Sequence, residues 1–259
     1  MDKKVLIIGY GVVGHNLAEE LRALEPWVYD KYKDIEEEEG RRVLYDFAYP
    51  SFEADIAFIC VDTPRTPAAA CDLSAVRDVL STAKAKVFVL KSTVLPGTTE
   101  ALRAEFPGKR IVFSPEYYGG TQHCNNFDFD FTILGGDKDD CACVQQALQE
   151  CYDARHRFVM TDPTTAELAK YMENAWLATK VSFCQQFSRL ASKCGVRYEE
   201  LRELFILDPR VNPSHTFVYD DHPYWDSHCL NKDVPAIAEW GDADLLKAVI
   251  AFNEACKGE

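Results

Sequence analysis

The chain of 259 residues contains no apolar run that approaches the roughly 18 residues needed to cross a lipid bilayer. We also expect no secretion signal, because Met1-Asp2-Lys3-Lys4 leads straight into a β-branched apolar segment. Basic residues are few: 28 lysines and arginines stand against 42 aspartates and glutamates, for a net charge of −14. These absences argue against a membrane span and against a nucleic-acid or anionic-membrane partner, so we expect a cytoplasmic protein.

Regular cysteine spacing is also absent. The ten cysteines lie at irregular intervals, which favours reduced thiols over a disulfide framework. Cys141-Ala142-Cys143 falls in an expected helix without a paired Cys/His cluster, so we expect no metal site. The acidic run Glu36–Glu39 is interpreted as a solvated face. An anionic small substrate stays open, because helix amino termini and local basic side chains can bind phosphate on an acidic protein.

Short apolar segments alternate with helical ones in the first part of the chain, which predicts an α/β fold with a Rossmann-like doubly wound parallel sheet. The expected strands are Lys4 to Ile8, Trp27 to Tyr29, Ile56 to Val61, Val87 to Leu90, Ile111 to Phe113 and Phe131 to Leu134. One long helix is expected from Ala166 to Cys194, with Gly195 as its stop. We place the sheet domain at residues 1–160 and a smaller all-helical domain at residues 161–259. The aperiodic segment from Asp208 to Trp225 is expected to form a loop over a site.

The first expected strand is followed by the glycine pattern Gly9-x-Gly11-x-x-Gly14, which is typical of dinucleotide binding. Gly9 permits a tight turn, Gly11 lets the backbone approach a pyrophosphate, and Gly14 lets helix and strand pack closely. Asp30 ends the next strand, where it can accept hydrogen bonds from a ribose diol and repel the extra phosphate of NADP. The pattern therefore favours NAD binding. The alternative is a glycine-rich turn that binds no ligand.

Polar side chains follow three further strands of the expected sheet. Thr63 and Thr93 are hydroxyls placed to bind a cofactor or water, and Glu116 is a carboxylate that can act as a base. Turn and capping chemistry is about as plausible for any one of them alone. On the long helix, Lys170 and Asn174 lie four residues apart and could stabilise a developing oxyanion, although solvation at the surface is the commoner role of a helical lysine.

A single cysteine near the carboxyl end precedes a Lys-Asp pair, as Cys229-x-x-Lys232-Asp233. A thiolate nucleophile in the same chain as a dinucleotide site suggests an oxidation through a covalent sulfur intermediate. A buried structural thiol is the alternative, and the adjoining Lys232 and Asp233 make it the weaker one.

The order and spacing of these motifs resemble the UDP-glucose/GDP-mannose dehydrogenase family over the whole chain. The matching segments are the three glycines, Val61-Asp62-Thr63-Pro64, Lys91-Ser92-Thr93 with Pro96-Gly97-Thr98, Ser114-Pro115-Glu116-Tyr117, Glu167-Leu168-Ala169-Lys170 with Asn174, Asp208-Pro209-Arg210-Val211, and Cys229 with Lys232-Asp233. The resemblance implies an NAD-dependent, four-electron oxidation of a sugar primary alcohol to the acid, through a thiohemiacetal and a thioester. It also implies a role in polysaccharide biosynthesis and a homodimer formed through the helical domain.

The same resemblance implies roles for individual residues. Cys229 would be the nucleophile, Lys170 and Asn174 would hold the substrate oxygen, and Asp233 would orient water or take a proton. Glu116 and Thr93 would serve the water that hydrolyses the thioester. The residues expected at the cofactor are Gly9, Gly11, Val12, Val13, Gly14, Asp30, Val61, Thr63, Thr93 and Lys232. The residues expected at a sugar-nucleotide-like substrate are Glu116, Lys170, Asn174 and Arg210.

Three departures bear on the substrate. The family precedes its cysteine with a glycine-rich loop, where this chain has the bulky segment His222–His228. Tyr118-Gly119-Gly120 replaces a further substrate-contacting segment, and the sequence stops at Glu259 where the family continues into a second nucleotide-binding domain. We therefore expect a short form with a different or more weakly held substrate, or a fragment. A two-electron hydroxyacid-type dehydrogenase that uses Lys170, and a catalytically silent NAD-binding module, are the alternatives.

Overall fold

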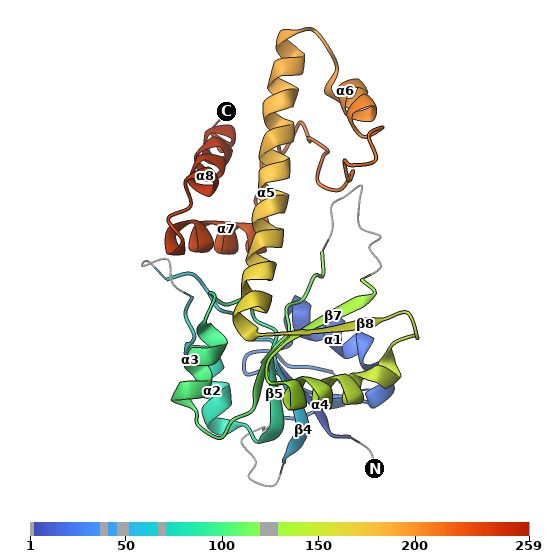
Figure 1. Ribbon diagram of the computed structural model, residues 1–259, viewed down its shortest axis with the longest axis vertical. Coiled ribbons are helices and arrows are strands. Elements are labelled where there is room, and N and C mark those ends of the chain that lie inside the picture. The colour runs from blue at the N-terminus through green and yellow to red at the C-terminus, as the bar shows by residue number, and fades with distance from the viewer. Residues whose placement is uncertain (1–2, 37–40, 46–51, 67–70, 120–128, 259) are drawn as a thin grey trace. The chain divides into compact units, whose positions relative to one another are not determined.

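The computed structural model describes residues 3–36, 41–45, 52–66, 71–119 and 129–258 (Figure 1). Glu36 is exposed, and the remainder of the acidic run interpreted as a solvated face lies outside the described residues, as do Gly120 and Cys124. The chain forms two compact units. The first comprises Met1–Thr66, Cys71–Tyr118 and Phe129–Lys170, and the second consists mainly of Tyr171–Glu259.

The first unit is a sheet covered by helices. Its strands are β1 (Val5–Ile8), β2 (Trp27–Tyr29), β3 (Arg42–Val43), β4 (Ala54–Ile59), β5 (Ala85–Leu90), β6 (Ile111–Phe113), β7 (Phe131–Gly135) and β8 (Arg157–Thr161). Its helices are α1 (Val12–Glu20), α2 (Ser74–Thr82), α3 (Thr98–Glu105) and α4 (Lys138–Leu148), with short 3-10 turns η1 (Arg22–Leu24) and η2 (Gln149–Cys151). The described residues confirm every expected strand to within two residues at each end.

The strand order is β3-β2-β1-β4-β5-β6-β7-β8. Strands β1 to β6 run parallel, which confirms the predicted Rossmann-like fold. The sheet departs from the parallel arrangement at one edge, because β7 pairs with β6 in the antiparallel sense and β8 follows the direction of β7. Such a reversal at the edge is common in large doubly wound sheets.

Alternate residues of the central strands face opposite layers of helices. Val5 and Ile7 of β1 belong to the buried cluster that includes α1 and α4, whereas Leu6 and Ile8 belong to the cluster that includes α2 and α3 (Figure 1). Because both faces are covered, β1 and β6 are continuous apolar runs instead of alternating ones. This packing fixes the carboxyl edge of the sheet, where the motif residues begin.

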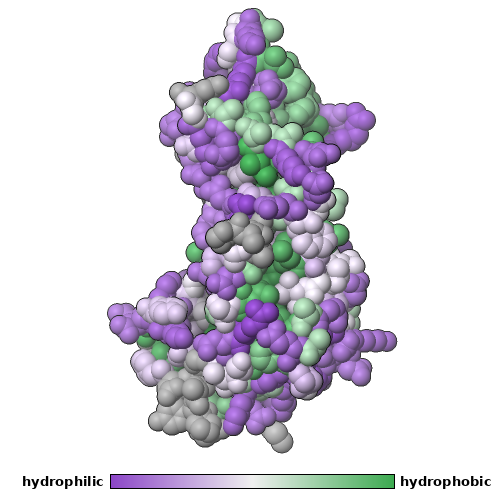
Figure 2. Space-filling view, turned by 90° about the vertical axis from the view of Figure 1, so that its left-hand side faces the viewer, coloured by the Kyte–Doolittle hydropathy of each residue, from purple (hydrophilic) through white to green (hydrophobic). Residues whose placement is uncertain are grey.

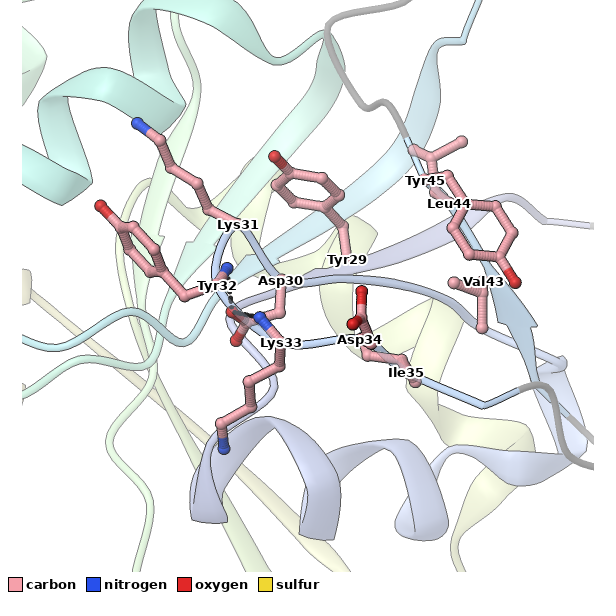
Figure 3. Close-up of a pocket in the computed structure, with 10 residues that line it drawn as sticks. All are labelled: Tyr29, Asp30, Lys31, Tyr32, Lys33, Asp34, Ile35, Val43, Leu44 and Tyr45. Carbon is pink, nitrogen blue, oxygen red and sulfur yellow. Dashed lines mark hydrogen bonds between the residues drawn. The ribbon is translucent and has the colours of Figure 1, made fainter.

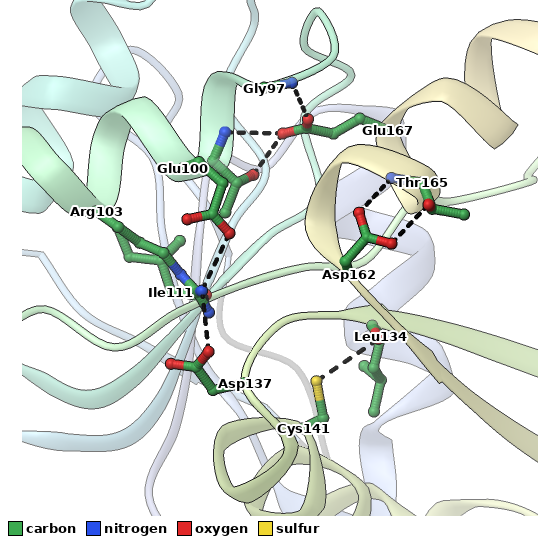
Figure 4. Close-up of polar contacts among 11 residues, drawn as sticks. Gly97, Glu100, Arg103, Ile111, Leu134, Asp137, Cys141, Asp162, Thr165 and Glu167 are labelled. Atoms are coloured by element: carbon green, nitrogen blue, oxygen red, sulfur yellow. Dashed lines mark hydrogen bonds and ion pairs between the residues drawn. The ribbon is translucent and has the colours of Figure 1, made fainter.

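The long helix α5 (Pro163–Lys193) begins three residues before the predicted start. Asp162 accepts hydrogen bonds from the Thr165 backbone N–H (2.9 Å) and hydroxyl (2.6 Å), as Figure 4 shows. Proline is favoured at the first helical position and aspartate just before it, so Asp162-Pro163 is itself the start signal. The predicted stop at Gly195 is confirmed, since Gly195 adopts a left-handed φ of 65° that is favourable for glycine.

The second unit is helical. It contains most of α5 together with α6 (Tyr198–Phe205), α7 (His228–Trp240) and α8 (Asp244–Lys257). Its buried apolar cluster comprises Ala178, Trp225, Leu230, Val234 and Val249. Residues 208–225 form a loop with one isolated bridge, as predicted. Within the described ranges, none of the helices combines the length and apolarity that a bilayer span requires.

Candidate active site

The glycine loop after β1 is under strict steric demand at two positions. Gly9 has a φ of 93°, and a β-carbon there would lie 2.6 Å from the Cys60 carbonyl oxygen. At Gly14 a β-carbon would lie 1.9 Å from the Gly9 carbonyl oxygen, so α1 packs on β1 only with glycine there. Gly11 caps α1 and has open space in place of a β-carbon. Of the three glycines, only Gly11 therefore leaves space beside the backbone for a ligand.

A groove of about 530 Å³ opens beside this loop in the first unit. It lies at the carboxyl ends of β1, β2 and β4 and is also lined by α2. Among the residues expected at the cofactor it contains Gly9, Gly11, Asp30 and Val61. Val12 and Val13 occupy the first turn of α1, where Val12 is exposed. The position of the groove, beside the glycine loop and the start of α1, fits the adenosine and pyrophosphate of a dinucleotide.

The Asp30 carboxylate is turned onto its own loop. It accepts hydrogen bonds from the backbone N–H of Tyr10 (2.7 Å), Tyr32 (2.8 Å) and Lys33 (3.1 Å), the last two visible in Figure 3. A smaller hollow of about 270 Å³ lies on the same loop. Lys31 pairs with Asp78 of α2 at 3.4 Å, and this neighbour raises the pKa of Lys31. Asp30 thus holds the loop that borders the groove in addition to the ribose-binding role predicted for it.

Hydrogen bonds between neighbouring strand ends position the two threonines. The Thr63 hydroxyl is buried and donates to the Thr93 carbonyl oxygen at 2.8 Å. The Ser92 hydroxyl donates in the opposite direction, to the Val61 carbonyl oxygen at 2.6 Å. The loops after β4 and β5 are thereby tied together, and Thr93 remains half-buried beside them.

Lys170 is only 5% exposed, which excludes the solvated surface lysine that sequence patterning alone favours. Its ammonium lies 4.7 Å from the centre of the Tyr117 ring, in a cation–π contact. Tyr117 directly follows Glu116 in the chain, and Glu116 is half-buried. The first unit therefore brings Lys170 to the segment that carries Glu116.

Glu167, one turn before Lys170, is a functional candidate that sequence reasoning left without a role. It is fully buried and accepts hydrogen bonds from the Gly97 N–H (2.6 Å) and from the Thr99 N–H (2.8 Å) and hydroxyl (2.6 Å), as Figure 4 shows. Burial raises the pKa of Glu167, and the bonds from Thr99 and Gly97 oppose that rise. Glu167 ties α5 to the amino terminus of α3, and so positions Lys170 relative to the Thr93 loop.

In the second unit the Asn174 amide donates to the Asp233 carboxylate at 2.7 Å. Both side chains are buried, and Lys232 forms an ion pair with the other oxygen of Asp233 at 2.7 Å. Asn174 follows Lys170 by one turn on the continuous helix α5. The unit therefore joins Asn174, Lys232 and Asp233 in one polar cluster.

Cys229 is exposed and occupies the second position of α7. The helix is capped by Ser227, whose hydroxyl accepts from the Leu230 N–H at 3.2 Å. The positive end of the α7 helix dipole lies at this turn, where it stabilises a nearby negative charge. The sequence signal for this was the serine two residues before the cysteine, which is a preferred capping residue.

The bulky loop before Cys229 is anchored through Trp225. Its backbone N–H donates to the Asn253 side chain (2.9 Å), its carbonyl accepts from the same side chain (3.0 Å), and its indole donates to Ser182 (3.1 Å). The indole is 4% exposed. Packing in the core of the second unit thus holds this loop in place.

Trp225→Ala should lower the free energy of unfolding by about 3–5 kcal/mol, because it removes a buried ring and strands the Ser182 hydroxyl. Trp240→Ala is the matched control, since Trp240 is 54% exposed and should change stability by less than about 0.5 kcal/mol. Urea unfolding of both variants measures the difference. Equal losses would show that Trp225 is no anchor.

Arg210 is exposed, and Asp208 holds its guanidinium, with the Arg210 Nε 3.0 Å from one Asp208 oxygen. This neighbour raises the pKa of Arg210.

The described residues contain no group of three histidine, cysteine, aspartate or glutamate side chains placed to hold a metal ion. The other candidate residues of the reaction are divided between the two units. Those in the first unit are Thr63, Thr93, Glu116 and Lys170, and those in the second are Asn174, Cys229, Lys232 and Asp233.

The glycine loop, the groove and the parallel sheet define a dinucleotide-binding α/β protein of the Rossmann class. The NAD-binding domain model of the UDP-glucose/GDP-mannose dehydrogenase family matches residues 13–156, and the central-domain model of the same family matches residues 164–255. The chain belongs to this family, and its cofactor is NAD, as the glycine pattern and Asp30 predict.

Curated relatives of similar sequence carry names of the same family. The chain is 26% identical over 227 residues to a UDP-glucose 6-dehydrogenase of Rickettsia prowazekii (82% of this chain, 51% of the relative). It is 28% identical over 232 residues to a GDP-mannose 6-dehydrogenase of Pseudomonas savastanoi pv. phaseolicola (80% and 52%). The chain thus spans about half the length of these curated relatives.

A solved UDP-glucose dehydrogenase from Pyrobaculum islandicum has the same fold, with a TM-score of 0.80 at 24% identity over 98% of this chain and 68% of that one. A 3-hydroxyisobutyrate dehydrogenase from Mycobacterium tuberculosis shares the fold with a TM-score of 0.70 at 16% identity, over 100% of this chain and 95% of that one.

Proposed function

We propose that the protein oxidises the primary alcohol of a sugar-nucleotide-like substrate to a carboxylate, with NAD as the electron acceptor, through a thiohemiacetal and a thioester on Cys229. The observation that carries the proposal is the exposed Cys229 in the capped first turn of α7, one turn from Lys232 and Asp233, in a chain of this family. A role in polysaccharide biosynthesis would follow from such a product.

NAD held in the groove beside Gly11 and Asp30 would supply a two-electron acceptor, so the two oxidations would consume two NAD molecules. Lys170 and Asn174 hold the substrate oxygen as negative charge develops on it, and Asp233 orients Asn174 and takes up a proton. The Cys229 thiolate adds to the aldehyde carbon, so that the second oxidation yields a thioester. Water then cleaves the carbon–sulfur bond, with Glu116 and Thr93 as the groups that activate and orient it.

Substrate contact is proposed for Glu116, Lys170, Asn174 and Arg210. For Arg210 this requires release from Asp208, which holds it now. The bulky loop anchored by Trp225 leaves less room at Cys229 than a glycine-rich loop would. We therefore expect a substrate preference that differs from that of UDP-glucose dehydrogenases.

The test is NADH formation at saturating NAD with UDP-glucose, UDP-N-acetylhexosamines and GDP-mannose as substrates. Turnover with one of them supports the proposal. NAD binding without turnover on any nucleotide sugar would favour a silent binding module, and turnover on small hydroxyacids would favour a two-electron dehydrogenase based on Lys170.

A homodimer is also proposed, on the basis of one apolar stripe along α5. Met172, Trp176, Phe183, Phe187 and Leu190 follow helical spacing, and each is at least 41% exposed. Figure 2 shows that apolar residues (green) form patches among polar ones (purple) on the molecular surface. Burying such a stripe against a second copy is the usual solution for a homo-oligomer.

Phe187→Asp should convert the dimer to a monomer, because a carboxylate in an apolar interface would lose its hydration without a partner. The matched control is Leu245→Asp on α8, at a position that is 69% exposed and off this stripe. Sedimentation analysis of both variants provides the measurement. A monomeric parent protein, or equal behaviour of the two variants, would contradict the dimer.

A further inference from the structure

Lys91 is a buried lysine to which the reaction proposed above gives no role. It follows β5 directly and is 8% exposed. Backbone hydrogen bonds align it with its neighbours, because the Lys91 N–H donates to Ile59 and the Ser114 N–H donates to Leu90 (both 2.9 Å). Lys91 therefore stands at the carboxyl edge of the sheet, between the chain segments that continue to Thr63 and to Glu116.

The Lys91 ammonium points into the turn that carries Glu116. Its nitrogen donates to the Pro115 carbonyl oxygen at 3.3 Å and contacts the Ser114 hydroxyl at 3.5 Å. The next residue is Glu116, whose carboxylate accepts from the Tyr118 N–H at 2.6 Å. The Tyr118 hydroxyl in turn contacts Glu20 at the end of α1. The Glu116 turn is therefore held by Lys91 on one side and by Tyr118 on the other.

Charged and titratable groups surround Lys91 from four elements. Burial lowers the pKa of Lys91, and the nearby positive charge of Lys170 on α5 lowers it further. Three groups raise it: Glu20 of α1, Cys60 after β4 and Glu116 after β6. A lysine whose folded-state pKa is lowered binds fewer protons in the folded than in the unfolded protein. The free energy of unfolding therefore rises with pH between the lowered pKa and about 10.4, and at neutral pH the buried lysine costs stability. Buried ionisable groups that cost stability cluster at functional sites.

We propose that Lys91 is a positioning residue for Glu116. Lys91 fixes the Ser114–Glu116 turn and interacts electrostatically with the Glu116 carboxylate while that carboxylate activates the water that hydrolyses the thioester. This inference rests on the function proposed above. In the step concerned, a water oxygen bonds to the thioester carbon, the carbon–sulfur bond breaks, Cys229 leaves as thiolate, and Glu116 receives the water proton. Lys91 does not touch the reacting atoms, and its action is through Glu116.

Lys91→Met, a neutral side chain of similar length, should separate the two halves of the reaction. NADH formed in the first turnover, before hydrolysis, should change by less than about 2-fold, whereas steady-state turnover should fall by at least about 10-fold. Lys91→Arg keeps the charge and should recover part of the loss. The melting temperature of Lys91→Met should not fall. An equal fall in both phases, or a 10-fold weaker affinity for NAD, would instead make Lys91 a structural support of the sheet edge.

A second measurement does not depend on activity. Titration of Lys91 by NMR of carbon-13-labelled lysine should give a lower pKa in Glu116→Gln than in the parent, because the Glu116 charge that raises it is gone. Glu105→Gln is the control, since Glu105 pairs with Arg77 and should leave Lys91 unchanged. An unchanged pKa of Lys91 in Glu116→Gln would overturn the inference. Absence of NADH formation in the parent would refute the proposed function, while the titration still decides whether Lys91 acts on Glu116.

Discussion

Cys229→Ala will lower turnover with the nucleotide sugar by at least about 10³-fold, the scale expected when a covalent nucleophile is removed. The thiol is exposed in the first turn of α7, so alanine takes its place without a cavity and the fold should persist. Affinity for NAD should be unchanged, because Cys229 is not among the residues that line the groove. Steady-state NADH formation, together with NAD titration of the same preparation, measures both quantities.

Cys194→Ala is the matched control for this variant. Cys194 is also an exposed cysteine and lies just after the end of α5. Its loss should leave turnover within about 2-fold of the parent, a change well below one kcal/mol in activation free energy. Activity that survives in Cys229→Ala would favour the two-electron hydroxyacid-type reaction, in which Lys170 is the acid and base and the cysteine is incidental.

Gly14→Ala and Gly11→Ala will fail in different ways although they make the same chemical change in one loop. At Gly14 the new methyl group would lie 1.9 Å from a backbone oxygen, so α1 must move away from β1. Overpacking of this kind costs about 1–3 kcal/mol, with a fall in melting temperature of roughly 2–4 °C per kcal/mol. Gly14→Ala should therefore lose stability and NAD binding together.

At Gly11 a methyl group in place of the α-hydrogen would have nothing within 4 Å, and the backbone angles are those of an extended residue that alanine adopts readily. The methyl group would enter the groove that the dinucleotide needs. Gly11→Ala should keep its melting temperature within about 2 °C of the parent. Its affinity for NAD should fall by at least about 10-fold, a loss of about 1.4 kcal/mol in binding free energy. Normal NAD affinity in Gly11→Ala would contradict the placement of the pyrophosphate at this loop.

Periodic and steric signals were sufficient for most of the fold. The buried strands β1 and β6 are continuous apolar runs, and β4 and β5 are so from Ile56 and from Val87 onward. The long helix is marked at both ends by Asp162-Pro163 and Gly195. The strands that were missed lack such signals. β3 has two residues, and β8 at the edge of the sheet has no buried residue, so neither carries an apolar pattern. Strand direction at β7 depends on tertiary packing, which local sequence does not encode.

The candidate site was predictable in residue identity more than in environment. Spacing identified Lys170 but could not show that it is buried against Tyr117, because a helical lysine is usually solvated. Glu167 belongs to the same motif, but its role depends on two N–H groups 68 and 70 residues away in sequence. Lys91 was part of a matching motif without a role, for the same reason: its contacts with Ser114 and Pro115 arise only when β5 and β6 pair.

The most direct test of the four-electron reaction is the number of NADH molecules formed for each nucleotide sugar consumed, at saturating NAD and limiting substrate. Oxidation through a thioester on Cys229 predicts two NADH for each carboxylate product. One NADH for each substrate, with an aldehyde or ketone as the product, would contradict it.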